Sequence, residues 1–67
     1  MTKTIKQLRP GDVVTRFPYA GPEQLPVTVS AVLHARLRSA RIVEGTDASG
    51  RRVLVPVGHF TNVCEVR

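Results

Sequence analysis

The amino-acid sequence predicts an all-β domain, and three segments carry this prediction. Two runs rich in Val and Ile, 41–46 and 51–57, flank the polar link 47–50, which is typical of a β-hairpin. Residues 27–33 begin with the alternation of apolar and polar side chains that marks a half-buried strand. Residues 18–26 hold three prolines and one glycine, so no regular element can persist there. The chain is therefore expected to fold as short strands joined by connections of unequal length.

The hairpin link and the C-terminal segment predict a turn, a strand end and a closing strand. The link 47–50 contains Asp, Ser and Gly; the first two can hydrogen-bond to their own backbone, and Gly adopts a positive φ without steric cost. Pro56 has no N–H group, so we expect it at a sheet edge or at the last paired residue of its strand. Residues 57–61 are too few for a helix of normal length and predict a single 3₁₀ turn before a last strand over 62–66.

The N-terminal part of the chain predicts one strand between two irregular segments. Residues 1–6 are polar and are expected either to fray or to form a short edge strand. The Leu-Arg-Pro-Gly-Asp run at 8–12 predicts a tight turn that leads into a strand over 13–17. The following Pro/Gly segment, 18–26, is expected to be a long, stiff loop that carries Tyr19.

Residues 27–41 allow two interpretations. The strand interpretation is favoured because the β-branched residues 27–29 commit the chain to an extended conformation, and residues 34–39 then form a basic loop. The alternative is a helix over 30–41 with Ser30 as its N-cap. Regular strand alternation would place four apolar side chains on one face: Val27, Val29, Ala31 and Leu33.

Five strands with these connections resemble the SH3-like small β-barrel. The long loop after the first strand resembles the RT loop of that superfamily, and 54–63 resembles its strand–3₁₀–strand ending. The resemblance covers residues 8–66 and concerns the architecture. It does not extend to proline-rich peptide binding, because this chain has no Trp, one Tyr and two Phe where such domains line their groove with aromatics. The pattern also resembles that of small basic proteins of GC-rich bacteria, their phages and plasmids.

Length and charge limit the possible functions. A chain of 67 residues forms one domain, 1–67, which buries so little surface that a closed barrel or a homo-oligomer would help to stabilise it. The net charge is +5, with basic residues concentrated in 1–16 and 34–52, which favours an anionic partner and nucleic acid first. One cysteine excludes an internal disulfide framework, and the sequence shows neither a signal peptide nor a long apolar run, so we expect a cytoplasmic protein with no membrane partner.

The titratable residues do not fall into a catalytic spacing, so the sequence predicts no enzyme, no cofactor and no metal site. Cys64 and His59 lie five residues apart across a predicted turn and are the one conceivable nucleophile–base pair. A cysteine on a closing strand is more often a small core residue. Phe17 and Phe60 are predicted to lie in the core, because so small a barrel needs large apolar side chains.

An arginine cluster is the candidate site. Arg36, Arg38 and Arg41 surround the basic loop, and Arg51 and Arg52 begin the strand after the hairpin turn. Because these strands are neighbours in an SH3-like barrel, we expect one arginine-rich surface that contacts nucleic-acid phosphates non-specifically, on DNA or RNA, with Tyr19 as a stacking group. The competing interpretation is a set of solvated loop charges with no binding role.

A protein-interaction module is the alternative function. The stiff loop 18–26 would bind a partner at low entropic cost, and Val32 on the face opposite Val27 suggests apolar surface on both sides of the sheet. An adaptor, a homo-oligomer or a phage-type modulator of a host protein would fit this pattern. Salt separates the two functions, since phosphate binding weakens steeply as salt rises and an apolar contact does not.

Overall fold

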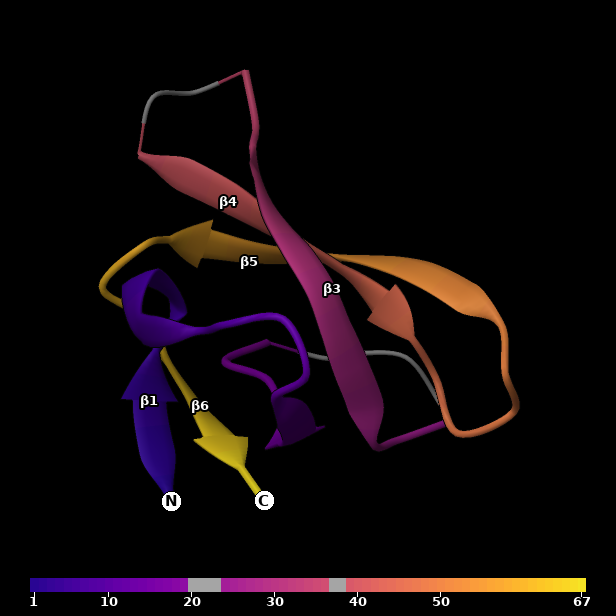
Figure 1. Ribbon diagram of the computed structural model, residues 1–67. Helices are drawn as coiled ribbons and strands as arrows, with labels where there is room; N and C mark the ends of the chain where they lie inside the picture. Colours follow the sequence, from indigo (N-terminus) through magenta and orange to yellow (C-terminus); the bar gives the residue numbers. More distant parts are fainter. Residues whose placement is uncertain (20–23, 37–38) are drawn as a thin grey trace.

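The computed structural model describes residues 1–19, 24–36 and 39–67, and within them the chain forms one antiparallel sheet (Figure 1). Six strands follow one another in the spatial order β1-β6-β2-β3-β4-β5. The strands are β1 (Thr2–Thr4), β2 (Val13–Arg16), β3 (Val27–His34), β4 (Ala40–Thr46), β5 (Arg52–His59) and β6 (Val63–Val66). The all-β prediction is confirmed. Among these ranges the helical structure is a single 3₁₀ turn, η1 (Ile5–Gln7), and no helix has the length and apolar character needed to cross a membrane.

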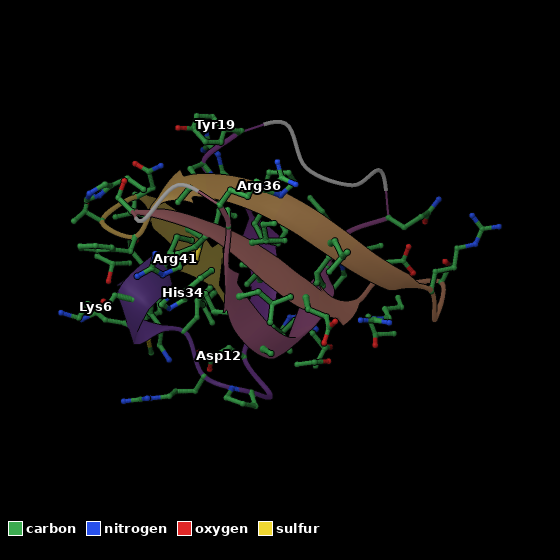
Figure 2. All side chains as sticks on the ribbon, turned by 90° about the horizontal axis from the view of Figure 1, so that it is seen from above. Lys6, Asp12, Tyr19, His34, Arg36 and Arg41 are labelled. Carbon is green, nitrogen blue, oxygen red and sulfur yellow. The ribbon has the colours of Figure 1, made fainter. Side chains whose placement is uncertain are left out.

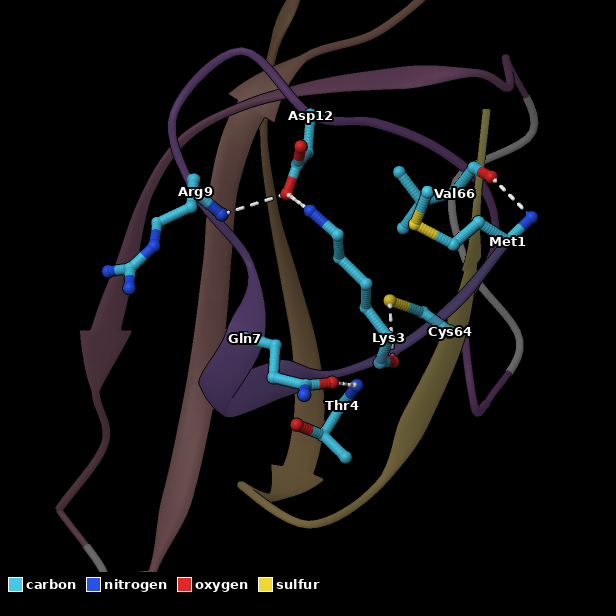
Figure 3. Close-up of polar contacts among 8 residues, drawn as sticks. All are labelled: Met1, Lys3, Thr4, Gln7, Arg9, Asp12, Cys64 and Val66. Carbon is cyan, nitrogen blue, oxygen red and sulfur yellow. Dashed lines mark hydrogen bonds and ion pairs between the residues drawn. The ribbon is translucent and has the colours of Figure 1, made fainter.

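The prediction of five strands in a barrel is corrected to six strands in an open sheet, with β1 and β5 as its end strands. The additional strand is β1, which confirms the edge-strand alternative for the N-terminal segment. It pairs with β6 through Thr2↔Glu65 and Thr4↔Val63, and the amino group of Met1 donates to the carbonyl oxygen of Val66 at 3.0 Å (Figure 3). These backbone partners hold the first residues in the sheet instead of leaving them frayed.

The 3₁₀ turn predicted at 57–61 is also wrong. Strand β5 continues to His59 because its register shifts by one residue there: Arg41 pairs with Gly58, whereas Ile42 pairs with Pro56. This β-bulge uses the positive φ of Gly58, +70°, inside the strand rather than in a helical turn. The 3₁₀ turn lies instead at η1, where the backbone N–H of Ile5 donates to Asn62 at 2.9 Å and that of Lys6 donates to Phe60 at 3.1 Å.

Strand β3 confirms the strand interpretation of residues 27–34 and excludes the helix alternative there. Its register against β4 shifts between Val29 and Ala31, so that Ser30 is an extra residue. The shift reverses the predicted facing of the second half of the strand. Val32 and His34 join Val27 and Val29 on the inner face, whereas Leu33 lies on the outer face with 39% of its surface exposed.

One hydrophobic cluster fills the concave side of the sheet. It takes its largest fully buried side chains from η1 and four strands: Ile5, Val14, Val27, Val43 and Val57. Because residues from both halves of the sheet share this cluster, the sheet must curve around it. Phe17 is in the core as predicted, but Phe60 is only half-buried.

The hairpin turn between β4 and β5 is confirmed. The Asp47 carboxylate accepts the backbone N–H of Ser49 at 2.9 Å, the Ser49 hydroxyl at 2.7 Å and the backbone N–H of Arg51 at 2.9 Å. These bonds hold the pKa of Asp47 below its ordinary value of 3.8. Gly50 has a φ of +89°, as the turn requires. Pro56 lies on the end strand β5, in agreement with its missing N–H group.

Candidate nucleic-acid interface

The four described arginines of the predicted cluster do not form one surface. Arg36 lies in the β3–β4 loop and Arg41 lies near the start of β4, paired with Gly58. Arg52 pairs with Thr46 at the other end of β4, and Arg51 precedes it. Six positions along β5 separate the two pairings, which is about 20 Å at ~3.3 Å per residue. Arg38 lies outside the described residues.

The two arginines at the hairpin end have carboxylates beside them. The guanidinium of Arg52 forms an ion pair with Glu44, which lies diagonally across from it on β4. Arg51 lies at the turn whose carboxylate, Asp47, accepts its backbone N–H. This end of the molecule therefore carries both signs of charge and is a poor match for a polyanion.

Tyr19 packs against the turn between β5 and β6. A Cβ atom on Gly58 would lie 2.7 Å from the hydroxyl of Tyr19, so the absence of a side chain at this position makes room for the phenol. The Asn62 side-chain amide donates to that hydroxyl at 3.3 Å and to the carbonyl oxygen of Val57 at 2.9 Å. Although 59% of Tyr19 is exposed, Figure 2 shows it across the β5 ribbon from Arg41. It is therefore not placed to stack beside the Arg41 side chain.

The structure assembles a different basic site, which we call the basic pocket. It is a hollow of about 340 Å³ at the open end of the core, and it takes residues from η1, the adjoining turn, β3, β4 and the β5–β6 turn. Its lining consists of Ile5, Lys6, Leu8, Val32, His34, Arg41 and Phe60. Lys6, His34 and Arg41 lie together around one end of the sheet (Figure 2). Only Arg41 of these residues belonged to the predicted cluster.

The register of the sheet brings the basic side chains together. His34 and Arg41 are directly opposite each other in the β3–β4 ladder. Each lies two residues from an inward-facing valine, Val32 or Val43, and therefore points to the same inner face. They are the last inward positions of this ladder, beyond the apolar core. Lys6 arrives from the other side, on the 3₁₀ turn that is hydrogen-bonded to Phe60. The pocket is therefore built by regular secondary structure and not by a long loop.

The ring of Phe60 is close to two cations. The Arg41 guanidinium carbon is 5.2 Å from the centroid of its ring, and the Lys6 ammonium nitrogen is 5.9 Å away. Both distances allow cation–π attraction. The ring of His59 is tilted against Phe60 with centroids 4.3 Å apart. Phe60 is thus a contact that Lys6 and Arg41 share at the rim of the hollow.

The described acidic side chains are bound elsewhere. Asp12 accepts the Lys3 ammonium and the backbone N–H of Arg9, each at 2.9 Å (Figure 3), and these bonds lower the pKa of its carboxyl. At the hairpin end, Glu44 pairs with Arg52 and Asp47 accepts hydrogen bonds within the turn. Glu65 accepts the hydroxyl of Thr2 at 2.9 Å. Within the described ranges, no carboxylate is among the residues that line the basic pocket. The described lining of the basic pocket therefore consists of basic, apolar and aromatic side chains.

Cys64 and His59, which the sequence offered as a conceivable nucleophile–base pair, each have a partner close by. Cys64 is buried, its thiol donates to the carbonyl oxygen of Lys3 at 3.5 Å, and burial raises its pKa above the ordinary 9.0. The Nδ1 atom of His59 accepts the backbone N–H of Thr61 at 3.1 Å and lies 2.6 Å from its hydroxyl. Cysteine is thus held as a neutral thiol while the histidine nitrogen is engaged locally. No group of three or more potential metal ligands occurs in ranges 1–19, 24–36 and 39–67.

Comparison of the chain with protein-family models, with curated proteins and with solved structures gave no match.

Proposed function

We propose that this protein is a small, non-catalytic binding module that contacts the phosphate backbone of nucleic acid through the basic pocket. The observation that carries the proposal is the convergence of Lys6, His34 and Arg41 on one hollow whose described lining holds no acid. Arg36, in the loop that follows His34, adds a third permanent cation near the same end of β3 and β4. The arginines of the hairpin end, 51 and 52, are no longer part of the proposed interface.

Physical chemistry favours a polyanion over a single acidic group. Two fixed cations and a histidine within one hollow raise the local potential, and neutralising phosphates there releases condensed counterions from the nucleic acid. Cation–π attraction to Phe60 favours positions of both cations at the hollow before binding, which lowers the side-chain entropy lost when a phosphate arrives. Contacts of this kind position a backbone and do not read sequence, in agreement with the expectation of non-specific binding to DNA or RNA.

The test is fluorescence anisotropy of labelled duplex DNA, single-stranded DNA and RNA at two salt concentrations. Three phosphate contacts predict a slope of log K against log salt of about −2.7 on duplex DNA, so binding should weaken about 40-fold between about 50 and 200 mM salt. The double variant Lys6→Gln/Arg41→Gln should flatten that slope to about −0.9. Arg51→Gln/Arg67→Gln removes the same charge from exposed positions outside the pocket and should keep more of the wild-type affinity and slope.

Two results would overturn the proposal. One is the absence of binding to all three nucleic acids at about 50 mM salt. The other is an equal loss in both double variants, which would show that net charge alone determines binding.

The superfamily, the cellular location and the genetic origin that the sequence suggests are part of the same proposal. An SH3-like relationship is supported by the long connection between β2 and β3 and by the short hairpin between β4 and β5. A cytoplasmic location is supported by the lone reduced cysteine. The origin as a phage or plasmid accessory protein rests on the resemblance in sequence pattern described above.

A protein contact is the second candidate function, and one observation favours it. The outer face of β3, β4 and β5 carries a row of apolar side chains, in which Leu33, Ile42 and Pro56 are cross-strand neighbours and Leu54 is 57% exposed. Such a face would suit a homo-oligomer or an adaptor. Sedimentation of the wild type and of Leu54→Lys, with little dependence on salt, would detect it. The loop 18–26 lies partly outside the described residues.

A further inference from the structure

The basic pocket has two chemically different parts. Ile5 and Leu8 are 1% and 5% exposed, and with Val32 they form an apolar floor. Lys6 and His34 are exposed and, with the half-buried Arg41, form a charged rim. Phosphate contacts need the rim and make no use of the floor. Ile5 and Leu8 belong to the hydrophobic core and Val32 packs against it, so the hollow opens directly onto apolar side chains that a phosphate does not contact.

We infer that the basic pocket accepts one unpaired base of a single-stranded nucleic acid, with the adjoining phosphates on Lys6 and Arg41. This inference rests on the proposed function and names the form of nucleic acid that it selects. A base has apolar faces and is flanked by charged phosphates, so it matches a hollow with an apolar floor and a cationic rim. Bases within a duplex are stacked and paired, and they cannot enter such a hollow without being extruded.

The hollow is large enough for a single base. Pockets that enclose drug-sized ligands span about 300–1,000 Å³, and the basic pocket lies near the lower limit. The guanidinium of Arg41 also offers a flat surface on which a base can stack, as arginine planes do in single-stranded recognition. Every base has such a face, so this contact requires an unpaired base without selecting its identity.

The first experiment removes the bases and keeps the phosphates. Binding of oligothymidylate of about eight nucleotides is compared with an abasic phosphodiester chain of equal length, within the range that single-strand binding sites cover. The abasic chain should bind about 10-fold more weakly, a loss of the size that one stacked base typically gives. Both chains should show the same salt slope, because their phosphates are equal in number. A duplex of the same length offers no unpaired base and should bind through its phosphates alone, with a salt slope of about −0.9 per contact against about −0.7 for the single chains.

A pair of neighbouring variants tests the location. Val32→Phe fills the hollow without changing the charge and should abolish the difference between the two chains while salt-dependent binding persists. Leu33→Phe makes a similar change on the outer face and should leave the difference intact. Thermal unfolding shows whether Val32→Phe is folded. If it is not folded, the inference is tested by the wild-type protein alone, through its binding of oligothymidylate and of the abasic chain.

The outcomes separate this inference from the proposed function. Equal, salt-dependent binding of the thymidylate and abasic chains would overturn the base pocket and leave phosphate binding in place. The absence of binding to either chain would overturn both. Thymidine monophosphate at the same total nucleotide concentration should displace the strand poorly. Displacement as strong as that by oligothymidylate would instead assign the pocket to free nucleotides.

Discussion

Replacing Gly45 by alanine should strongly destabilise the protein. Gly45 lies in the middle of β4, opposite Val29 on β3 and Val53 on β5. A Cβ atom there would lie 2.3 Å from the carbonyl oxygen of Thr28 and 2.8 Å from a methyl group of Val27. The first contact is with backbone of the paired strand, which no side-chain rotation can move. Strands β3 and β4 would have to separate locally by about 1 Å to reach ordinary contact distance.

The size of the effect follows from two opposing contributions. Overpacking a well-packed core costs about 1–3 kcal/mol, and the backbone contact places this site at the upper end of that range. Alanine recovers up to about 1 kcal/mol because glycine is conformationally unfavourable inside a strand. The expected net loss in the free energy of unfolding is about 2 kcal/mol. For 67 residues this loss lowers the melting temperature by about 14 °C, at an unfolding entropy of ~2.1 cal/mol/K per residue.

Thermal and urea unfolding followed by far-UV circular dichroism measure this loss. Thr46→Ala is the matched control, since Thr46 follows in the same strand, is exposed, and should tolerate alanine within about 0.5 kcal/mol. A melting temperature for Gly45→Ala that equals that of the wild type would refute the reasoning. It would mean that β3 and β4 do not approach as described, and the pairing of His34 with Arg41 would fall with it.

Two further predictions concern titration. The pKa of Asp47 is lowered by hydrogen bonds from Ser49 and Arg51, so its contribution to stability is complete above the unfolded pKa near 3.8 and is lost as pH falls through the lower folded value. The stability difference between wild type and Asp47→Ala, measured by urea unfolding, should therefore shrink on acidification from pH ~7 to ~3; a constant difference would contradict this. Cys64 should react with an aromatic disulfide reagent far more slowly in the native protein than in urea, because burial keeps it a thiol. Equal rates in the two states would show that its site is open.

The sequence was sufficient for the features that depend on local chemistry. The turn at Asp47 follows from side chains that bond to their own backbone, and the edge position of Pro56 follows from its missing N–H group. The two β-bulges could not be predicted from the sequence. A bulge at Ser30 is defined by pairing with β4, and Gly58 could serve equally in a turn or, as it does, within a strand. Sequence alternation alone cannot distinguish these cases.

The basic pocket was missed for the same reason. Turning His34 and its partner Arg41 to the inner face requires the phase change at Ser30, and Lys6 joins them through a 3₁₀ turn that its polar segment did not predict. Phe60 was assigned to the core because of its size, whereas it is half-buried with cations over its ring. One signal was available: if strand 27–34 forms a hairpin with strand 40–46, His34 falls near Arg41 in any register that keeps the loop short.

Charge by itself does not choose between a binding site and a solvated surface, but the environment of each charge does. At the hairpin end, Arg52 is paired with Glu44 and the Asp47 carboxylate lies in the turn next to Arg51, so both signs of charge are present there. At the other end, Lys6 and Arg41 share an aromatic ring, and the described lining of their hollow holds no acid. The positive charge that underlies the net charge of +5 is therefore unevenly distributed over the surface. A polyanion should bind preferentially at the basic pocket, even though both ends of the molecule carry arginine.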